Sequence, residues 1–245
     1  MPAEVSTGHT AKLNGREQVA EGTMAFHFDK PNGFEFRAGQ AIDVALLNPP
    51  DTDSEGNIRT FSIASPPFED RLTVATRMRD SAFKRVLKDM PLGTAVRIDG
   101  PSGSLTLHKN SSKPAVFLAG GIGITPFLSI LRQASEEKLP HRLYLFYSNR
   151  QPEDAPFLDT LSELQAGNPG FRFVPTMTEV GKSHQKWTGE TGVIDSRMLT
   201  KAIPSLQGPI YYVAGPPAMV VAMRQMLTAA GADEDDIRTE EFSGY

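Results

Sequence analysis

A run of glycines follows the apolar stretch Val116 to Ala119, in a segment that reads GGIGITP from Gly120 to Pro126. Glycine has no side chain, so such a turn lets phosphate groups approach backbone N–H groups. Thr125 as N-cap and Pro126 as the first helical residue favour a helix directly after the turn, with its positive end toward the ligand. The pattern predicts a phosphate site made by Gly120, Gly121, Gly123, Thr125 and Pro126. A strand–helix turn without a ligand stays open as the alternative.

A second turn of this design follows the apolar stretch 211–214 and reads GPPAM from Gly215 to Met219. Pro217 suits the first turn of a helix. In doubly wound folds, turns at the ends of parallel strands line the crevice that binds ligands. We therefore expect Gly215, Pro216, Pro217 and Met219 to line one crevice with the first turn.

Two further motifs lie in the first half of the chain. Arg59-Thr60-Phe61-Ser62 places a cation, an aromatic ring and a hydroxyl on a predicted strand, where they cannot all face one core. The segment from Arg79 to Lys84 predicts a helix start capped by Asp80 or Ser81, whose free N–H groups and lysine suit a phosphate. An ordinary strand with a solvated Arg59 and a capped surface helix remain the alternatives.

The composition excludes several classes of protein. The chain has 245 residues, 39% of them hydrophobic, which suits one large domain or two modest ones. It contains no cysteine, so disulfides, thiol catalysis and cysteine-ligated iron–sulfur clusters are excluded. The net charge of −4 argues against nucleic acid as a partner. No apolar run approaches the ~20 residues of a transmembrane helix, and we expect a cytoplasmic protein with no membrane partner.

The elements that must position these motifs differ between the two halves. Short apolar or alternating runs predict strands at 18–28, 42–47, 59–65, 72–77 and 95–99, with one amphipathic helix at 81–90. This order suggests a small antiparallel barrel.

After Pro114 the predicted strands alternate with helices, which indicates a parallel sheet covered by helices. Strands are expected at 115–119, 142–147, 171–175 and 210–214, and helices at 127–139, 155–165 and 218–230. The polar, turn-rich segment 108–114 predicts a boundary, with domains at 1–110 and 111–245.

Taken in order, the motifs resemble those of the ferredoxin–NADP reductase superfamily. The order is Arg-x-aromatic-Ser, the helix-start segment followed by Gly100-Pro101-Ser102-Gly103, Gly-Gly-x-Gly-x-Thr-Pro, and Ala-Gly-Pro-Pro-x-Met. The resemblance covers roughly residues 16–245. It implies an N-terminal FAD-binding β-barrel and a C-terminal α/β domain that binds NADH or NADPH.

By this resemblance, Arg59 pairs with the flavin phosphate, Phe61 packs against the isoalloxazine in place of the usual tyrosine, and Ser62 bonds near N5. The helix start supplies backbone donors to the pyrophosphate, and the strand before it lines the edge of the ring. The implied flavin set is Arg59, Thr60, Phe61, Ser62, Thr76, Arg77, Met78, Ser81, Ala82, Phe83 and Lys84.

The resemblance also assigns the nucleotide site. The first glycine turn holds the pyrophosphate, the Gly215 turn holds the nicotinamide, and Ser148, Asn149 and Arg150 lie where the adenosine ribose is read. Arg150 suits a 2′-phosphate, although loops that read only hydroxyls carry the same residues. Ala214 stands where relatives have cysteine, so we expect slower hydride transfer or looser placement of the nicotinamide.

The C-terminal segment carries a second likeness, because Glu240-Glu241-Phe242 matches the Glu-x-aromatic of relatives. Glu240 is the implied acid, and Phe242 and Tyr245 compete for the role of covering the flavin. The implied catalytic residues are therefore Ser62, Glu240 and Tyr245. A frayed acidic tail is the alternative. The five histidines show no spacing of metal ligands, and we predict no metal site.

These observations predict a flavin-dependent oxidoreductase that passes a hydride from NADH or NADPH to bound FAD and then electrons to an acceptor. The expected acceptor is a ferredoxin, a flavodoxin, an oxygenase component or a small molecule. Two alternatives stay open. One is a nucleotide- and flavin-binding regulatory module without hydride transfer, and the other is a flavin reductase that releases reduced flavin.

Overall fold

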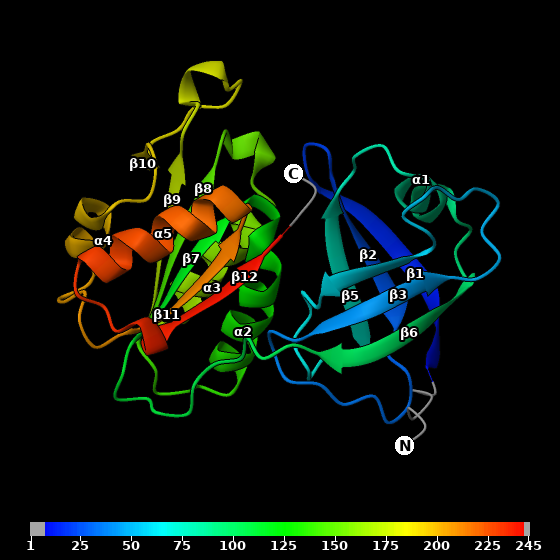
Figure 1. Cartoon of the computed structure of the whole chain (residues 1–245), viewed down its shortest axis with the longest axis horizontal. Helices are drawn as coiled ribbons and strands as arrows, with labels where there is room; N and C mark the ends of the chain where they lie inside the picture. Colours follow the sequence, from blue (N-terminus) through cyan, green and yellow to red (C-terminus); the bar gives the residue numbers. More distant parts are fainter. Residues whose placement is uncertain (1–7, 243–245) are drawn as a thin grey trace.

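In the computed structural model, which describes residues 8–242, six antiparallel strands form the first sheet. Their spatial order is β4-β3-β6-β1-β2-β5. The strands are β1 His9–Ala20, β2 Thr23–Asp29, β3 Ala41–Leu46, β4 Ile58–Ser62, β5 Arg71–Arg77 and β6 Ala95–Ser102. Just after β4, the Ala64 N–H donates to the Thr73 carbonyl of β5 at 2.8 Å, which joins the two edges. The sheet therefore curls into the expected barrel (Figure 1).

Helix α1 (Ala82–Asp89) covers this barrel with one apolar face. Its residues Phe83 and Leu87 are at most 1% exposed and join the barrel core with Phe26, Phe28 and Ile42. The Ser81 side chain caps the helix by accepting from the Lys84 N–H at 3.4 Å, as the sequence predicts.

The described part of the second half forms a six-stranded parallel sheet with the order β10-β9-β8-β7-β11-β12. The strands are β7 Ala115–Gly120, β8 Leu143–Asn149, β9 Phe171–Met177, β10 Glu190–Thr191, β11 Ile210–Gly215 and β12 Ile237–Glu241. Strands β7, β8, β9 and β10 extend to one side, and β11 returns to the other side of β7. The point where the strand order reverses therefore lies between β7 and β11.

Helices cover both faces of this sheet, so its central strands β7 and β11 are buried along their whole length. On one face, α2 (Ile124–Glu136) and α3 (Leu158–Gly167) pack against a cluster that includes Phe117 and Tyr212. On the other, α4 (Ser196–Ala202) and α5 (Pro217–Ala229) pack against a cluster that includes Leu118 and Tyr211.

Several predicted boundaries were wrong. The strand expected at 18–28 is a hairpin of β1 and β2, with Gly22 in the left-handed region at the turn. Helix α2 begins at Ile124 rather than after Thr125, and Gly123 occupies the N-cap without a side-chain bond. The Thr125 hydroxyl donates instead to the Ile122 carbonyl at 3.0 Å, so its capping role was also wrong.

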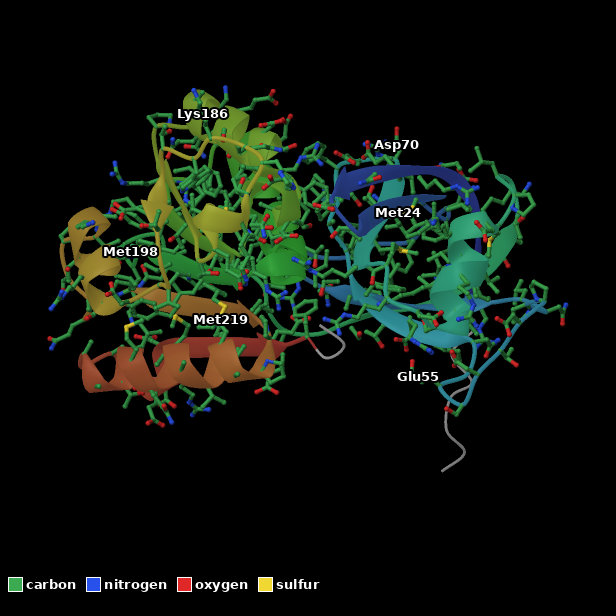
Figure 2. The ribbon with its side chains drawn as sticks, turned by 90° about the horizontal axis from the view of Figure 1, so that it is seen from above. Met24, Glu55, Asp70, Lys186, Met198 and Met219 are labelled. Atoms are coloured by element: carbon green, nitrogen blue, oxygen red, sulfur yellow. The ribbon has the colours of Figure 1, made fainter. Side chains whose placement is uncertain are left out.

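The two halves contact each other directly and lie side by side, with Met24 and Glu55 in one and Met219 in the other (Figure 2). The Ser129 hydroxyl of α2 donates to the Ser65 carbonyl at 2.8 Å, and Arg132 pairs with Glu69. Residues 103–114 join the halves between β6 and β7. The predicted boundary at 110/111 falls within this connection and stays a prediction.

Within residues 8–242, no helix combines the length and the apolar composition that crossing a membrane requires. The same residues contain no group of acidic or histidine side chains suited to a metal ion.

Candidate active site

A cavity of about 720 Å³ lies at the junction of the two halves. Its walls come from β4, β5, the start of α1, the turn between β7 and α2, and the segment after β12. Of the predicted flavin and nucleotide residues, it is lined by Arg59, Thr60, Phe61, Ser62, Thr76, Arg77, Ser81, Lys84, Thr125 and Phe242. The cavity therefore gathers residues that lie up to about 180 positions apart in the sequence.

Sequence reasoning did not assign six lining residues, which are Glu55, Ile58, Ala75, Arg79, Asp80 and Ile122. All six lie within four positions of a motif that was recognised, so their proximity to those motifs was the available signal. Among the predicted flavin residues, Met78, Ala82 and Phe83 do not line the cavity. Met78 and Phe83 pack in or against the barrel core instead.

One end of the cavity is cationic. Arg59, Arg79 and Lys84 line it beside the N-terminus of α1. Burial, together with the charges of Arg79 and Arg59, lowers the pKa of Lys84. A cluster of cations next to a positive helix end favours binding of a multiply charged anion such as a diphosphate.

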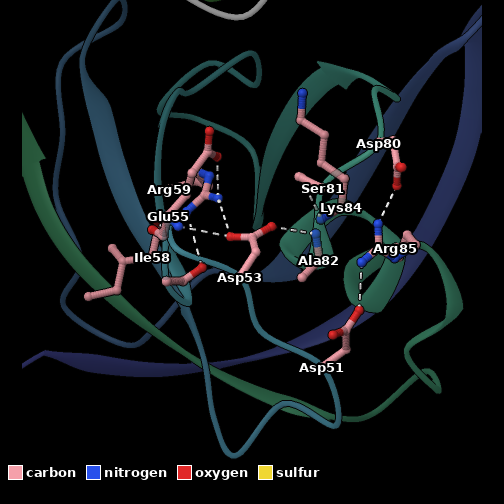
Figure 3. A network of polar contacts seen from close by, with 11 residues as sticks. Asp51, Asp53, Glu55, Ile58, Arg59, Asp80, Ser81, Ala82, Lys84 and Arg85 are labelled. Carbon is pink, nitrogen blue, oxygen red and sulfur yellow. Dashed lines mark hydrogen bonds and ion pairs between the residues drawn. The ribbon is translucent and has the colours of Figure 1, made fainter.

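The Arg59 guanidinium is held in place by the backbone that leads into β4 (Figure 3). Its Nη1 donates to the carbonyls of Glu55, Gly56 and Ile58 at 2.9, 3.2 and 2.7 Å. Its carbon Cζ lies 5.2 Å from the centre of the Phe83 ring. These contacts fix the direction of the guanidinium before any ligand arrives, which favours tight anion binding.

At the other end of the cavity, the Ser62 hydroxyl donates to Glu240 Oε1 at 3.0 Å. Ser62 is 4% exposed, and burial raises the pKa of Glu240 although the Ser62 hydrogen bond opposes that shift. Strand β12 places the carboxyl there, because it pairs in parallel with β11 and sets Glu240 opposite Ala214. The alternative of a frayed acidic tail is wrong for residues 237–241, because they form strand β12.

Glu240→Gln should change how stability depends on pH. Because burial raises the folded-state pKa above 4.5, the folded protein holds this proton more tightly than the unfolded chain does. The resulting stabilisation is present below pH 4.5 and is lost as the pH rises through the raised pKa. Gln keeps an oxygen for Ser62 but cannot titrate. In urea unfolding from pH 4 to 8, we expect the variant to gain stability over the wild type as the pH rises.

The matched control is Glu241→Gln, which removes an exposed carboxyl from the next position of the same strand. A parallel response of the two variants would contradict the assignment of the effect to the buried pair.

The two glycine turns pack against each other. A Cβ atom on Gly120 would lie 2.4 Å from Met219 Sδ and 2.9 Å from Pro216 Cδ. A Cβ atom on Gly123 would lie 2.4 Å from the Ala214 carbonyl oxygen. This packing accounts for the glycines by itself, without a ligand. The phosphate role of Gly120, Gly121 and Gly123 therefore stays a prediction.

The predicted nucleotide residues share the carboxyl edge of the parallel sheet. The turn from Gly120 to Pro126 follows β7, Ser148 and Asn149 end β8, and Gly215 to Met219 follow β11. Both amide atoms of Asn149 are buried without a hydrogen-bond partner in the described part of the chain, and the residue is 5% exposed. An orphaned buried amide suits a polar ligand such as a ribose.

The carboxyl edge of the parallel sheet adjoins the cavity, because Ile122 and Thr125 of the first glycine turn line the cavity. Arg150 is exposed beyond the end of β8. Phe242 packs against the cluster of Ala25, Ala75 and Ile122, which brings both halves together. Tyr245 lies outside the described residues, so the choice between Phe242 and Tyr245 stays open.

Comparison with known proteins agrees with this arrangement. Residues 117–225 match the family model of an oxidoreductase NAD-binding domain. The ferredoxin NADP+ reductase from Neisseria gonorrhoeae, solved with bound FAD and NADP, aligns with a TM-score of 0.80 and 23% identity over 96% of this chain and 98% of that one. The chain therefore shares the fold of this ferredoxin NADP+ reductase, and its second half matches an oxidoreductase NAD-binding domain. The resemblance drawn from the motifs is thereby confirmed.

Two curated relatives are similar in sequence over most of this chain. The reductase component of propane 2-monooxygenase from Rhodococcus jostii is 29% identical over 87% of this chain. The phenol hydroxylase P5 protein from Acinetobacter pittii is 29% identical over 89% of it. The chain spans 57% and 60% of the lengths of these two relatives.

Proposed function

We propose that this chain is an NAD(P)H-dependent flavoprotein reductase that binds FAD in the cavity and passes electrons to a separate redox protein. The observation that carries the proposal is the cavity itself. One end of the cavity presents the cations Arg59, Arg79 and Lys84, and its lining also includes Ser62, whose hydroxyl donates to Glu240. A dinucleotide flavin needs both ends, and a cavity of about 720 Å³ has room for its ring and diphosphate.

The residues present fit FAD. Arg59, Lys84 and the start of α1 would hold its diphosphate, and Phe61, Thr76 and Phe242 would border its ring. A bound flavin supplies the acceptance of a hydride from the nicotinamide and the release of electrons. The protein would position the flavin and hold a proton-bearing pair beside it. The Ser62 hydroxyl donates to Glu240 Oε1 at 3.0 Å, and burial raises the pKa of Glu240, so a larger fraction of this carboxyl is protonated than of an exposed glutamate at the same pH.

The proposed partner is an oxygenase component in the cytoplasm, with a ferredoxin, a flavodoxin or a small acceptor as alternatives. One of the two relatives is named as the reductase component of propane 2-monooxygenase, and the other as the phenol hydroxylase P5 protein. The net charge of −4 and the lack of a described membrane-spanning helix are compatible with such a partner. Ala214 stands where relatives have cysteine, and the pairing of β11 with β12 sets it opposite Glu240.

The test is the visible spectrum of the purified chain, before and after anaerobic addition of NADH or NADPH. We expect retained FAD whose absorption bleaches on reduction. Retained flavin without bleaching would favour the regulatory module. A chain that retains no flavin but reduces added flavin would favour the flavin reductase.

Arg150→Ala should reduce any preference for NADPH over NADH. An exposed guanidinium at the end of β8 can form a charge-assisted pair with a 2′-phosphate, which NADH lacks. Loss of such a pair corresponds to about a tenfold fall in the ratio of kcat/KM for NADPH to that for NADH. Steady-state kinetics with both nucleotides measures the ratio, and an equal ratio in variant and wild type would remove Arg150 from the site.

A further inference from the structure

Two carboxylates of the loop before β4 contact the anion-binding groups of the cavity (Figure 3). Asp53 Oδ2 accepts from the Ala82 N–H at the start of α1, at 2.7 Å. Glu55 Oε2 accepts from Arg59 Nη2 at 2.6 Å, and Asp53 Oδ1 lies 3.7 Å from the same nitrogen. The helix end and the guanidinium therefore both hold an internal anion.

The two carboxylates act as one unit. Asp53 Oδ1 also accepts from the Glu55 N–H at 3.0 Å, which closes a short turn and fixes the spacing between the two side chains. The hydrogen bond from Ala82, more than any other contact, lowers the pKa of Asp53, so this carboxyl is charged at neutral pH. Two linked negative groups facing a helix end and an arginine resemble a diphosphate in charge and in hydrogen-bond acceptors.

The two carboxylates can also move away from Arg59 and the N-terminus of α1. The side chains of Asp53 and Glu55 are 30% and 68% exposed, so water replaces their contacts at small cost. The Arg59 Nη1 contact with the Ile58 carbonyl lies within β4 rather than in the loop, so the guanidinium keeps this part of its support after the loop moves.

We infer that Asp53 and Glu55 form an internal anion that competes with the flavin phosphates for Arg59 and the N-terminus of α1, and that it thereby sets the affinity for flavin. The inference rests on the proposed function, because it takes flavin as the ligand of this cavity. Asp53 and Glu55 are affinity-determining residues, and binding of the phosphates requires the loop to move away.

The test compares flavin binding to the apoprotein of the wild type and of Asp53→Asn/Glu55→Gln. Asn and Gln keep the size and an acceptor oxygen, and Ser81 still caps α1, so the fold is preserved. Quenching of flavin fluorescence gives Kd for riboflavin, FMN and FAD, which carry no, one and two phosphates. We expect the double variant to bind FMN and FAD about tenfold more tightly and riboflavin with unchanged Kd. Glu55→Gln alone, at an exposed position, should show about a threefold gain.

The matched control is Asp51→Asn, which makes the same change of charge in the same loop. Asp51 pairs with Arg85 at 2.7 Å and contacts neither Arg59 nor Ala82 in any hydrogen bond of the described residues. We expect its flavin affinities to equal those of the wild type, which separates the local contact from the general change in charge.

The outcomes distinguish the two proposals. If the wild type binds FAD and the variants bind it equally or more weakly, the competition is wrong and the flavin function stands. Equal tightening of riboflavin, or an equal gain in Asp51→Asn, also overturns the competition. If the wild-type apoprotein binds none of the three flavins, the proposed function fails and this inference fails with it.

Discussion

Arg59→Ala should raise the Kd for FAD about 10- to 100-fold. A hydrogen bond between a guanidinium and a phosphate contributes about 1.5–3 kcal/mol, and each 1.4 kcal/mol corresponds to a factor of ten. The structure favours the upper part of that range. The variant also leaves the Asp53 and Glu55 carboxylates without the cation that they contact, so they repel the incoming phosphates. Titration of the apoprotein with FAD measures the change.

Two variants serve as controls for this prediction. Arg59→Lys keeps the charge but loses the forked donor, so it should recover only part of the affinity. Arg85→Ala removes a cation of α1 that pairs with Asp51 and Asp80 but does not itself line the cavity, and it should bind FAD as the wild type does. Purification of Arg59→Ala with a full complement of FAD and unaltered Kd would show that the phosphate binds elsewhere.

Gly123→Ala should destabilise the protein and weaken nicotinamide nucleotide binding. The new methyl group would lie 2.4 Å from the Ala214 carbonyl oxygen, a backbone atom that cannot rotate away. Overpacking of this kind costs about 1–3 kcal/mol. The strain pushes the turn after β7 away from the turn after β11, so we expect the nucleotide Kd to rise about tenfold or more. Urea unfolding and nucleotide titration measure the two effects.

Gly167→Ala is the matched control, because Gly167 ends helix α3 and an added Cβ meets no atom within 4 Å. It should be neutral or slightly stabilising, since alanine favours helices. FAD should stay bound in both variants, because the cationic end of the cavity is remote from this contact. A Gly123→Ala protein with wild-type stability would mean that the two turns separate without strain.

Local signals in the sequence predicted much of the fold and most members of the site. The cap Ser81, the strand that carries Arg59 and the helix after Pro217 depend on a few neighbouring residues, and the structure confirms each element. The sequence did not predict the first part of β1, residues 9–16, because these residues are mostly polar. It forms because β2 and β6 both offer it backbone partners, which no local pattern records.

Tertiary contacts account for what the sequence could not predict. Ser62 and Glu240 were each assigned to the flavin, but their hydrogen bond joins residues 178 positions apart. Residues 51–57 contain no apolar pattern that marks them as part of the site, and only the fold brings the Asp53 carboxylate to the N–H of Ala82. The glycines after β7 were interpreted through a ligand, whereas their tight contacts are with the neighbouring turn.

The placement of Glu240 on β12 has a consequence for synthesis of the protein. Domains generally fold as units, beginning from the N-terminal side, while the chain emerges from the ribosome. The barrel that carries Arg59 and Lys84 is complete when β6 has formed, more than a hundred residues before Glu240 is made. A nascent barrel can therefore present its phosphate-binding end before any nucleotide turn or acid exists. The proposed electron transfer from NAD(P)H would then wait until β12 joins β11 and the Phe242 N–H donates to the Gly215 carbonyl, at 3.0 Å.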